Sequence, residues 1–164
     1  MGKHKWYEGI WLVRHEDKHG NILYKDTIKN ILVDQGEFLM LDTFFRALNT
    51  PTTFYVRLCN DIVAETDTLS SVQNEPSGNG YVAAEVTRDN VGWPTLELNS
   101  GDYRVVSKEL SYTASGGDIG PVNCAYLATT SDNSGYLISA VALALSRTVV
   151  DGDTLYLQLA VKLQ

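Results

Sequence analysis

Alternation of aliphatic and polar side chains is clearest near the carboxyl end of the chain. Leucine or valine occupies every second position from 155 to 163, and Thr, Tyr, Gln, Ala and Lys occupy positions 154 to 162 between them. Successive side chains of a β-strand point to opposite faces of its sheet. The pattern therefore predicts an antiparallel strand at residues 153–163, with one face in the core and one face in water.

Short apolar runs separated by turn residues make up most of the remaining chain. The turns are rich in Gly, Asn, Asp and Ser, as at residues 99–102 and 115–118. Residues 60–80 are predicted to form a long loop. Further strands are predicted at residues 54–59, 81–88, 95–98, 103–113, 121–129 and 135–145. About eight or nine short strands with regular turns indicate a mainly β protein, an antiparallel β-sandwich of the jelly-roll type.

One segment of the chain shows helical periodicity. Between residues 34 and 48, apolar side chains fall at positions 38, 41, 44, 45 and 48, which places them along one stripe of a helix. Asp34 and Glu37 suit the N-cap and the first turn, and Asn49-Thr50-Pro51 would end the helix. We expect one short α-helix of about three turns that packs over the edge or mouth of a sheet.

The first 27 residues are predicted to form a hairpin. Residues 6–14 are rich in aromatic and aliphatic side chains, Gly20-Asn21 is a turn dipeptide, and residues 22–24 form a second apolar run. Strand, polar turn and strand make a β-hairpin with residues 15–21 at its tip. The chain is therefore divided into an amino-terminal hairpin arm, residues 1–27, and a single β-sandwich domain, residues 28–164.

Charge is distributed unevenly along the chain. The net charge is −7, yet residues 1–31 carry six Lys or Arg against four acidic residues, and all three histidines. A nucleic-acid-binding protein would show a clustered basic face, so we expect no nucleic-acid partner. A weakly basic amino end on an acidic body suits docking on another acidic surface, such as a neighbouring subunit. An uneven scatter of loop charges explains the distribution equally well.

Hydropathy and cysteine content indicate the cellular compartment in which the protein folds. No apolar run approaches the ~18 residues that span a bilayer, and the first nine residues lack the apolar core of a signal peptide. We therefore expect no membrane association, and folding in the cytoplasm. In that compartment Cys59 and Cys124, both within predicted strands, are expected to be buried free thiols. The sequence alone leaves open whether they pair.

Residues 15–19 match the His-Glu-x-x-His pattern of zinc proteases. The pattern works on a helix, where both histidines share one face and bind Zn²⁺ while the glutamate acts as general base. Here His15, Glu16 and His19 lie at the predicted hairpin tip, and no histidine follows His19 to supply a third ligand. A solvated hairpin tip is the better interpretation.

Other catalytic patterns are absent from the sequence. No Gly-x-Ser-x-Gly elbow, P-loop or dinucleotide fingerprint is present. Asp151-Gly152-Asp153 lacks the further oxygen ligands of a calcium loop and is interpreted as a tight turn. Paired carboxylates for glycoside hydrolysis remain open, because their spacing exists only in the fold. We expect no enzyme activity, cofactor or metal.

Aromatic side chains are numerous for a chain of this size. Nine tyrosines and three tryptophans would suit sugar platforms and protein interfaces equally. Trp93, on the predicted loop at residues 90–94, is the most prominent of them. Its simpler interpretation is a cap over the open end of the sandwich.

Segments spread over residues 28–164 resemble tailed-bacteriophage structural proteins. The segments are residues 30–36, 54–58, 67–69, 80–81, 86–94, 120–122, 135–138 and 147–155. The resemblance is to small jelly-roll-like proteins that decorate or cement the capsid exterior or belong to the tail. It implies a virion protein without catalytic residues, placed on the capsid exterior, that binds the major capsid protein or other virion proteins. It also implies self-association, for example as a trimer.

Three hypotheses follow for the function. The first is a capsid decoration (cement) protein that binds the outer shell and stabilises it. The second is a tail-associated or receptor- or carbohydrate-binding module, and the third is a zinc hydrolase that uses the histidine motif. For the first two, we expect the amino arm and the aromatic loops to bind the partner. The residues expected to do so are Lys3, His4, Lys5, Trp6, Trp11 and Trp93.

Overall fold

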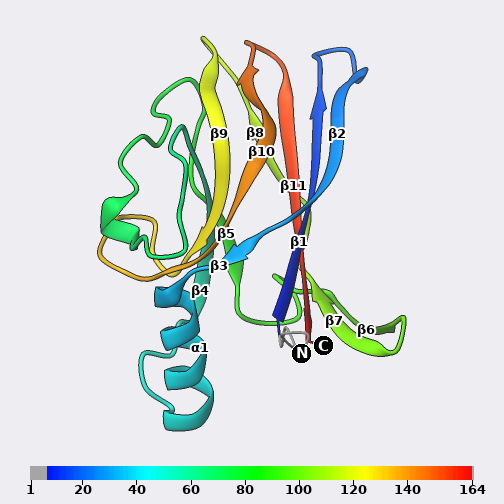
Figure 1. Cartoon of the computed structure of the whole chain (residues 1–164). Helices are drawn as coiled ribbons and strands as arrows, with labels where there is room; N and C mark the ends of the chain where they lie inside the picture. Colours follow the sequence, from blue (N-terminus) through cyan, green and yellow to red (C-terminus); the bar gives the residue numbers. More distant parts are fainter. Residues whose placement is uncertain (1–6, 164) are drawn as a thin grey trace.

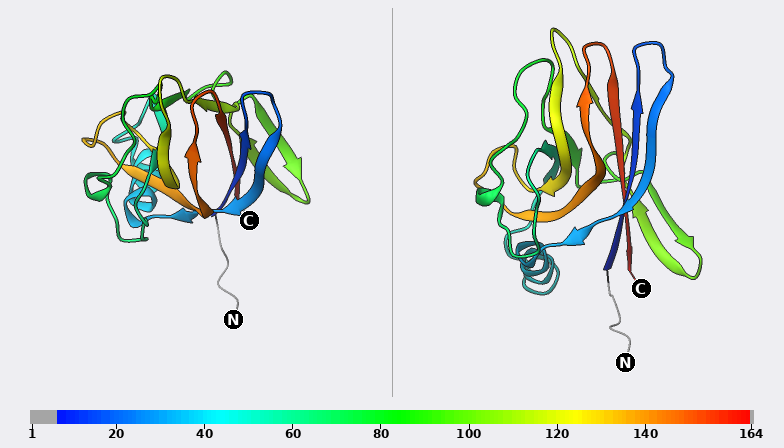
Figure 2. Two further views of the ribbon diagram at one scale, coloured as in Figure 1. Left: turned by 90° about the horizontal axis from the view of Figure 1, so that it is seen from above. Right: turned by 45° about the horizontal axis from the view of Figure 1, so that its top comes forward.

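The computed structural model describes residues 7–163, which form two antiparallel sheets packed face to face (Figures 1 and 2). The first sheet contains β1 (Tyr7–Glu16), β2 (Ile22–Lys29), β6 (Thr95–Asn99), β7 (Asp102–Val106), β8 (Leu110–Thr113) and β11 (Thr154–Leu163). The second contains β3 (Ile31–Leu32), β4 (Thr53–Cys59), β5 (Ala84–Thr87), β9 (Ile119–Ala128) and β10 (Leu137–Val149). A helix, α1 (Asp34–Arg46), and a short 3₁₀ turn, η1 (Leu69–Ser71), complete the fold. The predicted β-sandwich with one helix is confirmed.

The predicted alternation of the last strand is confirmed where that strand is deepest in the sheet. In β11, Leu155, Leu157 and Leu159 are fully buried. The strand pairs with β1 on one side and with both β7 and β8 on the other. The alternation fails from Ala160 onward: Ala160 is buried, Val161 is half-buried, and Leu163 is 60% exposed at the open end of the sheet.

Residues 7–163 form eleven strands, where about eight or nine were predicted for the chain. The segment predicted as one strand at residues 103–113 is broken into β7 and β8. The break centres on Ser107, which is fully buried and bonds to the backbone of β11: its Oγ accepts the Leu159 N–H at 3.0 Å, and its N–H donates to the Leu159 carbonyl at 2.8 Å. Two-residue β3 adds the other strand.

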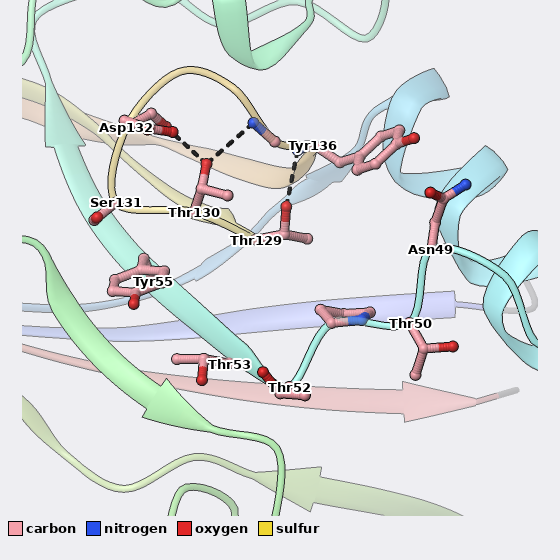
Figure 3. Close-up of a pocket in the computed structure, with 12 residues that line it drawn as sticks. Asn49, Thr50, Thr52, Thr53, Tyr55, Thr129, Thr130, Ser131, Asp132 and Tyr136 are labelled. Carbon is pink, nitrogen blue, oxygen red and sulfur yellow. Dashed lines mark hydrogen bonds between the residues drawn. The ribbon is translucent and has the colours of Figure 1, made fainter.

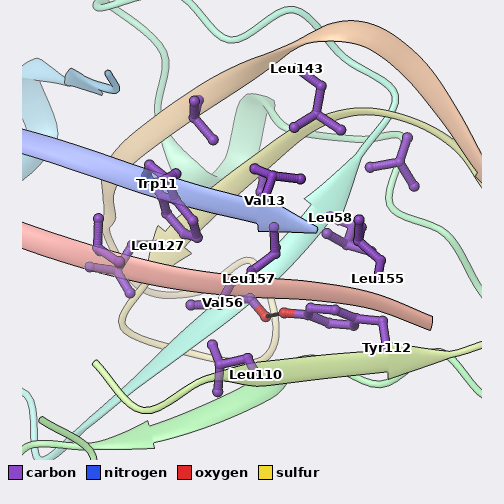
Figure 4. Close-up of a cluster of buried hydrophobic side chains, with 14 of the residues drawn as sticks. Trp11, Val13, Val56, Leu58, Leu110, Tyr112, Leu127, Leu143, Leu155 and Leu157 are labelled. Carbon is purple, nitrogen blue, oxygen red and sulfur yellow. Dashed lines mark hydrogen bonds between the residues drawn. The ribbon is translucent and has the colours of Figure 1, made fainter. Parts of the chain in front are cut away.

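The hairpin at the amino end is confirmed, but residues 7–27 are not a separate arm. β1 lies between β2 and β11, and its ten residues pair one for one with those of β11, from Tyr7 opposite Leu163 to Glu16 opposite Thr154. Trp11 and Val13 of β1 point into the main core (Figure 4). A strand in mid-sheet belongs to the domain, so the predicted boundary after residue 27 is wrong for the described part of the chain.

The main core fills the space between the sheets. Inward residues of β1, β8 and β11 meet those of β4, β9 and β10, and the Tyr112 hydroxyl joins the two sheets by donating to the Val56 carbonyl at 2.8 Å (Figure 4). A smaller core lies on the other face of the second sheet and includes Leu69 and Val72 of the long loop. Cys59 and Cys124 are register partners in this smaller core, and both are free thiols.

Helix α1 has nearly its predicted bounds but not its predicted cap. Val33, not Asp34, is the N-cap, and Ala47 ends the helix in a left-handed conformation with φ of 54°. Gly36 brings the helix close to β10, because a Cβ at this position would lie 2.1 Å from the Ile138 carbonyl oxygen. Within residues 7–163, no helix is long and apolar enough to cross a membrane.

Candidate functional site

The histidine motif does not form a zinc site. His15 is on strand β1 and 4% exposed, whereas His19 lies in the exposed turn, where its N–H donates to Asp17 Oδ1 at 2.8 Å. The hairpin position was predicted correctly, but His15 is not solvated: it faces inward, and its Nε2 lies 3.3 Å from Oδ2 of Asp153. Within residues 7–163, no group of three or more His, Cys, Asp or Glu side chains is placed to hold a metal ion.

An apolar groove opens at the end of the sandwich where β1 begins and β11 ends. Its volume is about 380 Å³, and we call it the end groove. Trp93 lines it and packs edge-on against Phe54, with ring centroids 6.0 Å apart. Tyr7, Phe44 and Val161 line it as well. Figure 1 shows α1 on one side of this end of the molecule and the β6–β7 hairpin on the other.

The side of α1 that faces away from the sandwich is strongly apolar. Only Gly36, Leu39 and Asp42 of the helix are buried. These three positions, spaced three apart, turn the predicted apolar stripe away from the core. We define the outer face of α1 as the exposed side chains of Phe38, Leu41, Phe44 and Phe45, together with Leu48 just after the end of the helix. The helix packs against β10, as expected of a helix at the edge or mouth of a sheet, but the predicted stripe is not the side that packs.

The exposure of this outer face is unusual. Phe44 is 81% exposed, Phe45 76% and Phe38 49%. Taking about 200 Å² for an aromatic side chain, these three rings alone present roughly 400 Å² to solvent. The largest apolar patch of a typical monomer covers ≈ 300–600 Å² and is often functional. The outer face of α1 reaches that size without its leucines.

The β6–β7 hairpin adds apolar side chains at the same end of the molecule. Leu96 and Leu98 of β6 are 74% and 63% exposed, and Tyr103 of β7, paired with Leu98, is 65% exposed. We call the outer face of α1, the end groove and these three hairpin residues together the helix-end surface. The three parts gather exposed apolar side chains at one end of the described part of the chain.

Helix α1 is held firmly to the sandwich beneath this surface. Gln35 Oε1 accepts two backbone N–H groups, from Leu69 at 3.0 Å and from Leu137 at 2.6 Å. Asp42, 2% exposed, pairs with Arg46 at 2.9 Å and accepts the Asn49 side-chain amide at 2.8 Å. The apolar outer face is therefore presented on a fixed element.

A second hollow, rich in hydroxyl groups, lies beside the C-terminal end of α1 (Figure 3). Its volume is about 550 Å³, and its walls are residues 49–53 and the β9–β10 loop, residues 129–136. Tyr55 of β4 completes the lining. We call this hollow the hydroxyl pocket.

The β9–β10 loop beside this pocket is fixed by hydrogen bonds of its own. Thr129 Oγ1 accepts the Tyr136 N–H at 2.9 Å. Thr130 Oγ1 accepts the Gly135 N–H at 3.1 Å and donates to the Asp132 carbonyl at 2.9 Å. The Ser134 side chain and N–H bond to the Asp132 carboxylate and lower its pKa.

Buried Arg57 of β4 also binds the β9–β10 loop. The guanidinium, 3% exposed, donates to the Asp132 carbonyl at 2.7 Å and to Asn133 Oδ1 at 3.0 Å. It also forms a two-point ion pair with Glu75, whose Oε1 accepts the Tyr81 hydroxyl at 2.5 Å. Burial, with the bond to Glu75, raises the pKa of Tyr81 well above its ordinary value. Arg57 thus joins the two long loops to the outer side of the second sheet.

The residues predicted to bind a partner differ in their position and burial. Lys3, His4, Lys5 and Trp6 lie outside the described residues. Trp11 is fully buried, so the expectation that it contacts a partner is wrong. Trp93 is half-buried and packs against the main core, in agreement with a capping role, while it also lines the end groove.

The outer face of α1 was not predicted from the sequence, although one signal for it was present. Residues 38–48 contain seven large apolar side chains, including Leu39 and Met40 outside the predicted stripe. A helix that buries one side needs fewer, so the excess indicated an apolar outer side. The residues of the hydroxyl pocket carried no comparable signal in the sequence.

Comparison with models of known protein families gave no match for this chain, and comparison with curated proteins gave no significant match.

Proposed function

We propose that this chain is a structural protein that docks on a larger protein assembly through the helix-end surface. The observation that carries the proposal is the exposure of Phe44 and Phe45 on a helix that is otherwise well anchored. Exposed aromatic side chains on a rigid element are typical anchors of protein interfaces. At about 25 cal/mol per Å², covering roughly 400 Å² of ring surface would contribute on the order of 10 kcal/mol before the costs of association.

We further propose that the assembly is the outer shell of a tailed-phage capsid, with this chain as a decoration protein. Two observations support this step. Residues 28–164 resemble phage structural proteins, and the β-sandwich has exposed apolar side chains at one end, on the helix-end surface. A standard interface buries about 800 Å² per partner, and the three phenylalanines would supply about half of that. Many such contacts on a repeating shell add by avidity. Self-association on the shell belongs to the same proposal.

Binding to purified phage heads tests the proposal. The full chain is mixed with heads and sedimented, and the amount bound per head is measured. The variant Phe44→Ser/Phe45→Ser is expected to lose binding by a factor of about 100 or more, since each anchor is worth on the order of 2 kcal/mol. Its matched control is Leu145→Ser on β10, a residue 65% exposed outside the helix-end surface. Equal binding by both variants would contradict the docking surface.

A second candidate function is a tail-associated or receptor-binding module. The observation that favours it is the hydroxyl pocket, which an attachment protein for a shell does not require. Electron microscopy of phage particles mixed with the full chain would support this candidate over the first if the added density were confined to the tail. Binding of the chain to host cells and not to heads would support it as well.

A further inference from the structure

The hydroxyl pocket has the size and support of a ligand site. Its volume of about 550 Å³ lies within the ≈ 300–1,000 Å³ range of small-molecule sites. Its two walls come from segments nearly 80 residues apart in the chain, residues 49–53 and 129–136, and the hydrogen bonds of Thr129, Thr130 and Arg57 fix the second wall. A wall that is ordered before binding lowers the entropy cost of taking up a ligand.

The unused polar groups of the pocket are mainly hydroxyls. Within residues 7–163, the side chains of Thr50, Thr52, Thr53, Tyr55 and Ser131 have no hydrogen-bond partner, although all five line the pocket. A hydroxyl both donates and accepts, so five of them suit a ligand that does the same at several positions. A polyhydroxylated molecule has that character.

Charge around the pocket argues against an ionic ligand. Of the twelve described residues that line it, none is Lys, Arg or His. An anionic ligand such as a phosphate would therefore find no cation at the site. The one carboxylate, Asp132, accepts the Ser134 N–H at 2.9 Å and the Ser134 hydroxyl at 2.6 Å, both at Oδ1, and its negative charge further disfavours an anion. The pocket thus favours a neutral ligand.

Two tyrosine rings supply apolar contact area within this polar lining. Figure 3 shows Tyr55 and Tyr136 at opposite sides of the pocket, with Thr129 and Thr130 between them. The Tyr136 ring is held by stacking on Phe38, with centroids 6.0 Å apart. An aromatic ring with a polar tip can cover the C–H face of a sugar while its hydroxyl bonds to the sugar.

We propose that the hydroxyl pocket binds a short neutral saccharide. The hydroxyls of Tyr55 and Ser131 bond to the sugar, and the ring of Tyr136 covers one of its apolar faces. The proposal does not depend on docking through α1, because none of the residues in the outer-face variant lines this pocket. It gives the second candidate function a specific site and a ligand class.

Titration of the full chain with defined sugars tests the proposal. The probes are glucose, galactose, mannose, N-acetylglucosamine and their disaccharides, with N-acetylneuraminic acid as an anionic control. Binding is followed by the amide NMR signals of residues 129–136, with sugars up to about 50 mM so that a millimolar Kd is measurable. We expect shifts at these amides with at least one neutral sugar and none with the anionic control.

Variants decide whether the pocket itself is responsible. Tyr55→Phe/Ser131→Ala removes two hydroxyls and is expected to weaken binding about tenfold. The control Ser111→Ala removes an exposed hydroxyl from β8, in the other sheet, and should leave the Kd unchanged. Absence of shifts with every neutral sugar, equal binding of the anionic sugar, or an unchanged Kd in the double variant would each overturn the proposal. Loss of binding to phage heads would not affect it.

Discussion

Nε2 of His15 lies 3.3 Å from Oδ2 of Asp153, and both residues are more than nine-tenths buried. The pair joins the end of β1 to the start of β11, at the opposite end of the sandwich from α1 (Figure 1). Burial lowers the pKa of His15 from its ordinary value of 6.5 and outweighs the attraction of Asp153. The positive charge of Arg147 lowers that pKa further.

The first prediction concerns stability against pH. Because the pKa of His15 is lower in the folded chain, the unfolded chain binds a proton first, so the free energy of unfolding falls as pH decreases below about 6.5. The loss ends once pH is below the folded pKa. We expect His15→Gln, measured by urea unfolding from pH 8 to 5, to flatten this dependence.

A matched control is available in the same hairpin. His19→Gln removes an exposed histidine from the turn and should keep the wild-type slope of stability against pH. A wild-type slope in His15→Gln would show that the buried histidine is not the group that titrates.

The second prediction concerns the buried ion pair of Arg57 and Glu75. Arg57→Met leaves the Glu75 carboxylate without its partner and should lower the free energy of unfolding by about 3–5 kcal/mol. The double variant Arg57→Met/Glu75→Gln should cost less than the two single variants added together. Arg104→Met breaks the partly exposed Arg104–Glu97 pair and should cost less than about 1 kcal/mol. Similar losses for Arg57→Met and Arg104→Met would contradict the structural role given to Arg57.

The third prediction concerns the attachment of α1. Gln35→Met removes the oxygen that accepts the Leu69 and Leu137 N–H groups, at a cost of about 1–3 kcal/mol for each donor left buried. Gln35→Glu keeps an acceptor oxygen and should lose less stability. Thermal unfolding of both variants measures the difference, and a larger loss in Gln35→Glu would show that acceptance by this side chain is not what anchors the helix.

The fourth prediction concerns the two thiols. Cys59 and Cys124 are buried opposite each other on β4 and β9, and contact with Cys59, together with burial, raises the pKa of the Cys124 thiol. Since the thiolate is the reactive form, both cysteines should resist an aqueous thiol reagent in the folded chain and react fully in urea. Rapid reaction of either thiol under native conditions would contradict the burial of both cysteines beneath the long loop that contains Leu69 and Val72.

Local patterns in the sequence predicted the elements better than their partners. The alternation in β11 and the period of α1 each report which side chains share a face, and both elements formed where expected. No local pattern states which strand pairs with which, so the pairing of β1 with β11 was missed, and Trp11 was taken for a surface anchor. The period of α1 identified its apolar stripe but not which side of the helix packs on the sheet, and the buried side holds Gly36 and Leu39 instead of the stripe.

The candidate sites were less predictable than the fold. Trp93 was identified, and it does lie at an open end of the sandwich, lining the end groove. The hydroxyl pocket joins Thr50 and Thr53 to Ser131, residues that look like ordinary loop positions in the sequence. They come to line one hollow only when β4 and β9 pair and bring the two segments together.

Electron cryomicroscopy of phage heads saturated with the full chain tests the central proposal most directly. We expect density for the sandwich at regular positions on the shell, oriented so that the outer face of α1 and the β6–β7 hairpin contact the capsid. The turn at residues 17–21 should point away from the shell, because it lies at the opposite end of the molecule (Figure 1). Contact through that turn, or heads that carry no added density, would contradict docking through the helix-end surface.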